Sequence, residues 1–215
     1  CPVLKKILLM SLIVLLTGCQ TAYYSAMEKV GVHKRDILVD RVEEARDSQD
    51  EAQQQFKDAL EQYRAVVQFN GGELETLYNR LKGEYDDSVD AADQVSARIK
   101  SVEQVAEALF EEWQDELEQY QNTGLRAQSE KQLKDTQKRY AELLRVMKRA
   151  EQRMQPVLTA LNDNVLYLKH NLNARAVGAL KGEFAGIRQN IDRLISEMQR
   201  SIQESDTFIR SMETQ

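Results

Sequence analysis

The chain has few of the residues that bend a backbone, crosslink it or bind metals. Its 215 residues include 2 Pro, 9 Gly, 2 Cys and 2 His. Because turns depend on Gly and Pro, this scarcity excludes collagen-like chains and argues against a loop-rich enzyme fold. Two cysteines exclude a disulfide scaffold. The histidines, His33 and His170, form no metal-binding motif, so we expect no metal site.

The sequence also lacks the motifs of nucleotide chemistry. Neither G-x-x-x-x-G-K-[ST] nor G-x-G-x-x-G occurs, so we expect no nucleotide and no cofactor. Asp and Glu outnumber Lys and Arg by 35 to 29, which argues against nucleic-acid binding. The acidic pairs Asp86-Asp87 and Glu111-Glu112 point about 100° apart on a helix, as solvated faces do. We therefore predict no catalytic residues and no enzyme activity.

The N-terminal segment has the pattern of an export signal. Lys5 and Lys6 precede an apolar run over residues 7–16, which is too short for a membrane span of about 20 residues. The following residues, Leu16, Thr17, Gly18 and Cys19, resemble the lipobox of bacterial lipoproteins. The resemblance implies that residues 1–18 are a signal peptide and that Cys19 is acylated. A signal peptide with a chance cysteine is the alternative.

The residue after the cysteine bears on the destination. Gln20 stands where lipoproteins retained in the inner membrane usually have Asp, so the resemblance implies export to the outer membrane. Residues 19–31 would then be an acylated tether, and residues 32–215 a single elongated helical domain. We expect translation to begin at Leu4, so that residues 1–3 are not part of the translated protein.

From residue 34 onward, apolar residues recur at alternating steps of three and four. The first of these seams consists of Leu38, Val42, Ala45, Gln49, Ala52, Phe56, Ala59, Tyr63 and Val66, and the second and third seams extend to Tyr120 and Leu172. This period of 3.5 predicts helices that pack along narrow seams. The pattern is interrupted at residues 70–72, 122–124 and 169–173, where Asn and Gly are typical of turns. We therefore predict an all-α fold, an elongated antiparallel bundle or coiled coil of four long helices. If the corner at 171–173 is absent, the alternative is a three-helix rod.

Two segments are candidates for function. Lys34 and Arg35 follow the tether, where they would contact lipid headgroups or simply be solvated at a helix start. The second segment concentrates asparagine near the last corner. Its residues would form a partner-docking surface or fix the helix register, or merely cap and turn the chain. The residues concerned are Asn164, His170, Asn171, Asn173 and Arg175.

These segments also carry a family resemblance. YYSAMEKVGVHKRDILVDRVEEAR, MKRAEQRMQPVL and VLYLKHNLNARA resemble domain-of-unknown-function family 2959, uncharacterised envelope lipoproteins of proteobacteria. The resemblance implies an envelope location and helical character, and it supplies no catalytic residues.

The sequence therefore leads us to expect a non-enzymatic lipoprotein on the periplasmic face of the outer membrane. It would act as a scaffold or adaptor, held to the membrane by its acyl chains and bound to an envelope protein or to itself. One rival is a helical module that contacts or remodels lipid, although an acidic body counts against it. A second rival is an enzyme or metal protein that uses His170.

Overall fold

The computed structural model describes residues 33–71 and 73–214. They form four α-helices, α2 (Lys34–Val67), α3 (Leu74–Leu117), α4 (Thr123–His170) and α5 (Ala174–Glu213). No strand occurs within these ranges. The all-α prediction is confirmed. The three-helix alternative is wrong, because α4 ends at His170 and a separate helix begins at Ala174.

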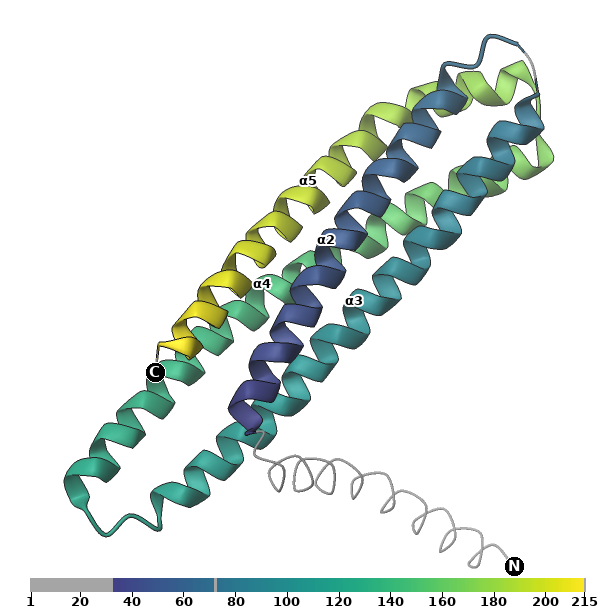
Figure 1. The fold of residues 1–215 in the computed structure, drawn as a ribbon. Coiled ribbons are helices and arrows are strands. Elements are labelled where there is room, and N and C mark those ends of the chain that lie inside the picture. Colours follow the sequence, from purple (N-terminus) through teal and green to yellow (C-terminus); the bar gives the residue numbers. More distant parts are fainter. Residues whose placement is uncertain (1–32, 72, 215) are drawn as a thin grey trace, which may run out of the picture.

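The helices lie side by side in an elongated antiparallel bundle (Figure 1). Each helix packs against its neighbours in the chain, and α5 also packs against α2 and so closes the ring. Consequently α2 and α4 lie diagonally opposite, as do α3 and α5. Short connections favour this antiparallel order, since a chain that turns within a few residues must run back beside itself.

The seams that the sequence predicts form the core. In α2 every seam position is buried, namely Leu38, Val42, Ala45, Gln49, Ala52, Phe56, Ala59, Tyr63 and Val66. Burial of each large apolar side chain contributes about 1.5–3 kcal/mol, so these seams hold the bundle together. Two predicted seam residues, Tyr120 and Leu172, are instead exposed. Both follow the last residue of their helix, so the helical period no longer applies to them.

Local sequence explains where the helices begin and end. Gly71, after α2, has a φ of +131°, a conformation that residues with a side chain rarely adopt. Asn122 caps α4 by accepting hydrogen bonds from the amides of Gly124 and Leu125, at 2.9 and 3.1 Å. Pro156 lies inside α4, which continues through it.

The two ends of the bundle differ. Lys34, the first residue of α2, lies beside Glu112, so α3 continues past the start of α2. The turn between α3 and α4 therefore projects as a two-helix extension, which we call the near end because the chain enters α2 on this side (Figure 1). The far end contains the segment between α2 and α3 and the corner between α4 and α5.

Candidate docking site at the far end

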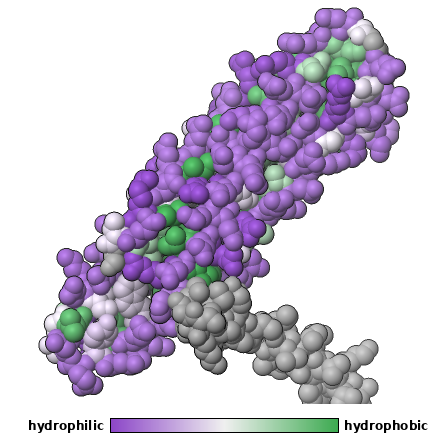
Figure 2. All heavy atoms as spheres, viewed as in Figure 1, coloured by the Kyte–Doolittle hydropathy of each residue, from purple (hydrophilic) through white to green (hydrophobic). Residues whose placement is uncertain are grey.

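Exposed apolar side chains gather at the ends of the bundle. Among the described residues, five large apolar side chains are exposed. Leu166, Tyr167 and Leu172, which are 49%, 42% and 40% exposed, lie at the far end, and we call them the far-end patch. Tyr120 and Leu125 lie at the near end. Figure 2 shows a mostly hydrophilic surface with apolar areas at the upper end, at the lower end and at several points along the lower half. Such clusters mark surfaces for binding.

The far-end patch adjoins a shallow open pocket at the start of α3. Leu172 lines this pocket together with Leu74, Thr76 and Asn79, and Glu73 and Glu75 complete the lining. The α4–α5 corner, which contains Leu172, also carries the exposed cationic side chains of Lys169 and Arg175. The far end thus combines an apolar centre with an acidic edge and a basic edge, an arrangement suited to a polar-rimmed protein contact.

A hydrogen-bonded tyrosine supports this end from inside. The Tyr63 hydroxyl lies 2.9 Å from Asn164 Oδ1 and 3.1 Å from the Leu180 carbonyl oxygen, both of which accept. Asn164 Nδ2 donates to the Ala160 carbonyl oxygen at 2.7 Å. The Tyr63 ring stacks on Phe184, with centroids 5.8 Å apart. One side chain of α2 therefore joins α4 and α5.

This environment changes the acidity of Tyr63. Burial raises the pKa of the Tyr63 phenol well above its usual value, and the nearby Glu183 carboxylate adds to the increase. The hydroxyl consequently stays protonated and remains a donor for Asn164. The sequence identified Asn164 but treated Tyr63 only as a seam residue. The hydroxyl that Tyr63 brings into the buried seam is the signal that identifies it, since a buried hydroxyl needs a hydrogen-bond partner.

The other predicted residues of the corner have local roles or face solvent. Asn173 caps α5, accepting from the amides of Arg175 and Ala176 at 3.0 and 3.1 Å. Asn171 Nδ2 donates to the Tyr167 carbonyl oxygen at 2.9 Å. The side chains of His170 and Arg175 are exposed. The corner therefore contains a helix cap and exposed charged side chains next to the far-end patch. Asn164 is buried below this surface.

At the near end, Lys34 and Arg35 differ from a freely solvated pair. The Lys34 ammonium lies 2.8 Å from a carboxylate oxygen of Glu112, and its side chain is only 12% exposed. Arg35 is half-buried. The Lys34 charge is thus held against α3, where it fixes the start of α2 rather than extending away from the bundle.

A family comparison now identifies the chain. Residues 23–212 match the family model described as "Protein of unknown function (DUF2959)". The chain belongs to this family. The match covers all four helices and confirms the resemblance carried by the far-end and near-end segments. No curated protein and no solved structure matches the chain.

For this DUF2959 protein, several predictions concern residues outside the described ranges. Leu16, Thr17, Gly18 and Cys19 lie there, as do the predicted signal peptide and the predicted tether. Within the described part of the chain, no helix is long and apolar enough to cross a membrane. Nowhere in residues 33–71 and 73–214 do three or more His, Cys, Asp or Glu side chains gather as metal ligands would.

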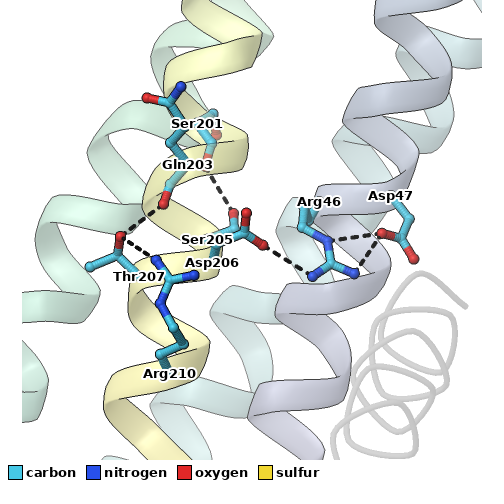
Figure 3. Close-up of polar contacts among 8 residues, drawn as sticks. All are labelled: Arg46, Asp47, Ser201, Gln203, Ser205, Asp206, Thr207 and Arg210. Atoms are coloured by element: carbon cyan, nitrogen blue, oxygen red, sulfur yellow. Dashed lines mark hydrogen bonds and ion pairs between the residues drawn. The ribbon is translucent and has the colours of Figure 1, made fainter.

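The middle of the DUF2959 bundle contains a second polar region, between α2 and α5. Arg46 of α2 bonds to Asp206 of α5 at 3.1 Å, and Ser205 donates to the Ser201 carbonyl oxygen at 3.0 Å (Figure 3). One helical turn from Arg46 lies Gln49, which is fully buried. The antiparallel register places Gln49 and Ser201 at a similar level. Neither side chain has a hydrogen-bond partner among the described residues.

Proposed function

We propose that this protein is a lipid-anchored helical spacer on the periplasmic face of the outer membrane. In this role it holds the far-end patch away from the membrane and presents it to a second envelope protein. It has no catalytic function. The observation that carries the proposal is the separation of the two features: the predicted anchor, Cys19, precedes the near end, while the far-end patch lies at the opposite end.

The dimensions support a spacer. With a rise of about 1.5 Å per residue, α2 alone spans about 50 Å. Acyl chains on one cysteine contribute about 0.8 kcal/mol for each buried CH₂, enough for stable attachment once several chains are present. Confinement to a membrane also raises the effective concentration of the far end near any partner on a neighbouring surface.

The bundle supports an adaptor better than a lipid-binding module. The Lys34 ammonium, a candidate for headgroup contact, already pairs with Glu112. Within residues 33–71 and 73–214, the largest group of exposed apolar side chains lies at the far end, opposite the end where the chain enters α2. Co-sedimentation of the unacylated body, without residues 1–19, with anionic liposomes separates the two functions, since only the lipid-binding module would sediment.

The anchor is tested by labelling with palmitate. We expect the wild-type chain to incorporate label and to fractionate with the outer membrane, and the Cys19→Ser chain to do neither. Wild-type protein without label, together with a Cys19→Ser chain that stays in the outer membrane, would overturn the proposal.

The docking role is tested with a photo-crosslinking amino acid at Leu172 and, as control, at Arg193. Arg193 is exposed on the flank of α5, away from both ends. We expect a discrete crosslinked product from position 172 only, and its loss when Tyr167→Asp is added. Equal crosslinking from both positions, or persistence in the Tyr167→Asp chain, would contradict a docking site at the far-end patch.

A further inference from the structure

Charge is divided unevenly between two adjacent helices. α3 carries twelve Asp and Glu against four Lys and Arg, whereas α4 carries ten Lys and Arg against five Asp and Glu. The overall charge of −6 conceals this division. Since α3 and α4 pack side by side, one flank of the bundle is acidic along one helix and basic along the next.

The opposite charges border a single groove in the half of the bundle towards the near end. Phe110 of α3 meets Tyr140 of α4 edge to face, with centroids 5.4 Å apart. Lys148 of α4 lies 2.9 Å from Glu103 of α3, which fixes the register of the two helices. An open groove here is lined by Phe110, Glu111, Gln114, Asp115 and Gln137. We call this surface the α3–α4 face.

Each edge of the α3–α4 face carries a row of charge at helical spacing. The acidic row on α3 recurs every four residues and consists of Glu103, Glu107, Glu111 and Asp115. The basic row on α4 consists of Lys131, Lys134, Lys138 and Lys148. Its first three residues follow at steps of three and four, and the gap lies before Lys148. Residues at steps of three and four share one side of a helix, so Glu103 to Asp115 and Lys131 to Lys138 each form a continuous edge, and Lys148 lies beyond a gap.

Most of these charges are available for contacts with another molecule. Glu107, Glu111 and Asp115 are exposed, as are Lys131 and Lys138. None of the five forms an ion pair with another residue in the described ranges. The acidic row also acts on its surroundings, because Glu103 and Glu107 assist burial in raising the pKa of Tyr140 to about 12.

Two-fold symmetry determines what this face can bind. When two copies meet face to face about an axis parallel to the bundle, α3 of each copy lies opposite α4 of the other. Both contacts then join an acidic row to a basic row at the same height.

When the axis is perpendicular to the bundle and the copies run antiparallel, α3 faces α3 and α4 faces α4, which places like charges together. A two-fold contact of this kind is also closed, so assembly stops at two copies.

The face is large enough for a stable contact. Helices of 44 and 48 residues are about 65–70 Å long, and two of them together are about 20 Å wide. The whole α3–α4 flank thus offers about 1,300 Å², more than the roughly 800 Å² that each partner buries in a standard interface, and the charged rows occupy its near-end half. Phe110 and Tyr140, both half-buried, supply an apolar centre between the charged rows.

We propose that the α3–α4 face binds a second copy of this chain in a parallel two-fold dimer. The proposal rests on charge, register and symmetry, and it does not depend on the predicted lipid anchor. Parallel packing nevertheless brings both near ends to the same side, so two anchored copies can pair within one membrane. The dimer presents two far-end patches in the same direction.

The charge rows are tested by reversal and restoration, with purified full-length protein in detergent at low salt. One variant carries Lys131→Glu, Lys134→Glu and Lys138→Glu, and another carries Glu107→Lys, Glu111→Lys and Asp115→Lys. Each places like charges opposite one another in both contacts of the dimer. We expect each variant to raise the dimer dissociation constant at least tenfold in sedimentation experiments, and the combined variant to restore dimerisation.

Control measurements keep this test decisive. Circular dichroism establishes that each variant keeps its helical content, and restoration in the combined variant would itself exclude misfolding. A monomeric wild-type protein, open-ended oligomers, or triple variants that dimerise normally would each overturn the proposal. Loss of binding to anionic vesicles in the Lys-to-Glu variant without any change in mass would assign the basic row to lipid instead.

The parallel orientation is tested with one cysteine near the symmetry axis. Gln114 lines the groove close to the near end, so Gln114→Cys lies beside its own copy only in a parallel dimer. We expect oxidation in membranes to give a disulfide-linked dimer that the parent chain does not give. Gln94→Cys, on the side of α3 towards α2, is the matched control and is expected to remain monomeric. Crosslinking at 94 but not at 114 would contradict the proposed face.

Discussion

The bundle contains two buried polar regions that are built differently. Around Tyr63 at the far end, hydroxyl and amide groups on different helices bond to one another. In the middle, Gln49 is as deeply buried, yet its amide oxygen and nitrogen have no partner among the described residues, and Ser201 Oγ is in the same state. The first region joins helices at the end that carries the far-end patch. In the second region Ser205 donates to the Ser201 carbonyl oxygen, but the buried Gln49 amide and the Ser201 hydroxyl form no hydrogen bond within the described residues.

The difference teaches that polarity in a helical core has two opposite energetic effects. A buried polar group with a hydrogen-bond partner adds about 1 kcal/mol net to the free energy of unfolding. If that group is removed, its partner stays buried without a hydrogen bond, which costs more than the bond contributed. An unsatisfied buried group costs about 1–3 kcal/mol while it remains. Substitution at the two places should therefore change the free energy of unfolding in opposite directions.

The largest effect is expected for Tyr63→Ala. Removing this buried ring leaves a cavity beside Phe184 and deprives Asn164 of its donor, which should lower the free energy of unfolding by about 3–5 kcal/mol. Urea unfolding followed by circular dichroism measures it. Tyr167→Ala is the matched control, because Tyr167 is exposed, and we expect a change within about 0.5 kcal/mol. Similar losses in both variants would mean that Tyr63 does not hold the far end together.

Gln49→Leu should have the opposite sign. Leucine fills a similar volume without polar atoms to desolvate, so the free energy of unfolding should rise by about 1–3 kcal/mol. Exposed Gln54, one turn further along α2, provides the control Gln54→Leu, for which we expect little change. If Gln49→Leu destabilises the protein, the amide has a partner in solution, and the contrast between the two polar regions does not exist.

Sequence periodicity was sufficient for the framework of the bundle but not for these polar regions. The steps of three and four predicted four helices and the buried seam of α2, because the helix period is a local property. Tyr63 and Asn164 are 101 residues apart, and their contact depends on which helices lie diagonally opposite. Of the far-end patch, only Leu172 lies on a predicted seam, and that seam extends past the end of α4, where the chain is no longer helical.

Alkaline pH should weaken the tyrosine-dependent part of the structure. The phenol pKa values of Tyr63 and Tyr140 are raised by burial, so both stay protonated in the folded protein after the unfolded chain begins to ionise near pH 10. The folded state then binds more protons, and stability falls as pH rises. Each tyrosine contributes a slope of at most about 1.4 kcal/mol per pH unit.

Unfolding midpoints measured from pH 8 to 12 test this slope. In Tyr63→Phe, the free energy of unfolding should decline less steeply at alkaline pH, because the phenol of Tyr63 is gone. At neutral pH the variant should be less stable than the wild type, since Asn164 loses its hydrogen-bond donor. An unchanged slope in Tyr63→Phe would show that this phenol ionises equally in both states.

The smallest effect concerns the corner that separates the four-helix bundle from a three-helix rod. Asn173→Ala removes the two cap bonds to the amides of Arg175 and Ala176 and should cost about 1 kcal/mol. Asn173→Ser restores an accepting oxygen and should recover most of the loss. Asn122→Ala at the near end removes an equivalent cap and should cost a similar amount. Alanine favours a continuous helix. If Asn173→Ala raises the free energy of unfolding while Asn122→Ala lowers it, α4 and α5 prefer to merge into one helix. The far-end patch would then not form.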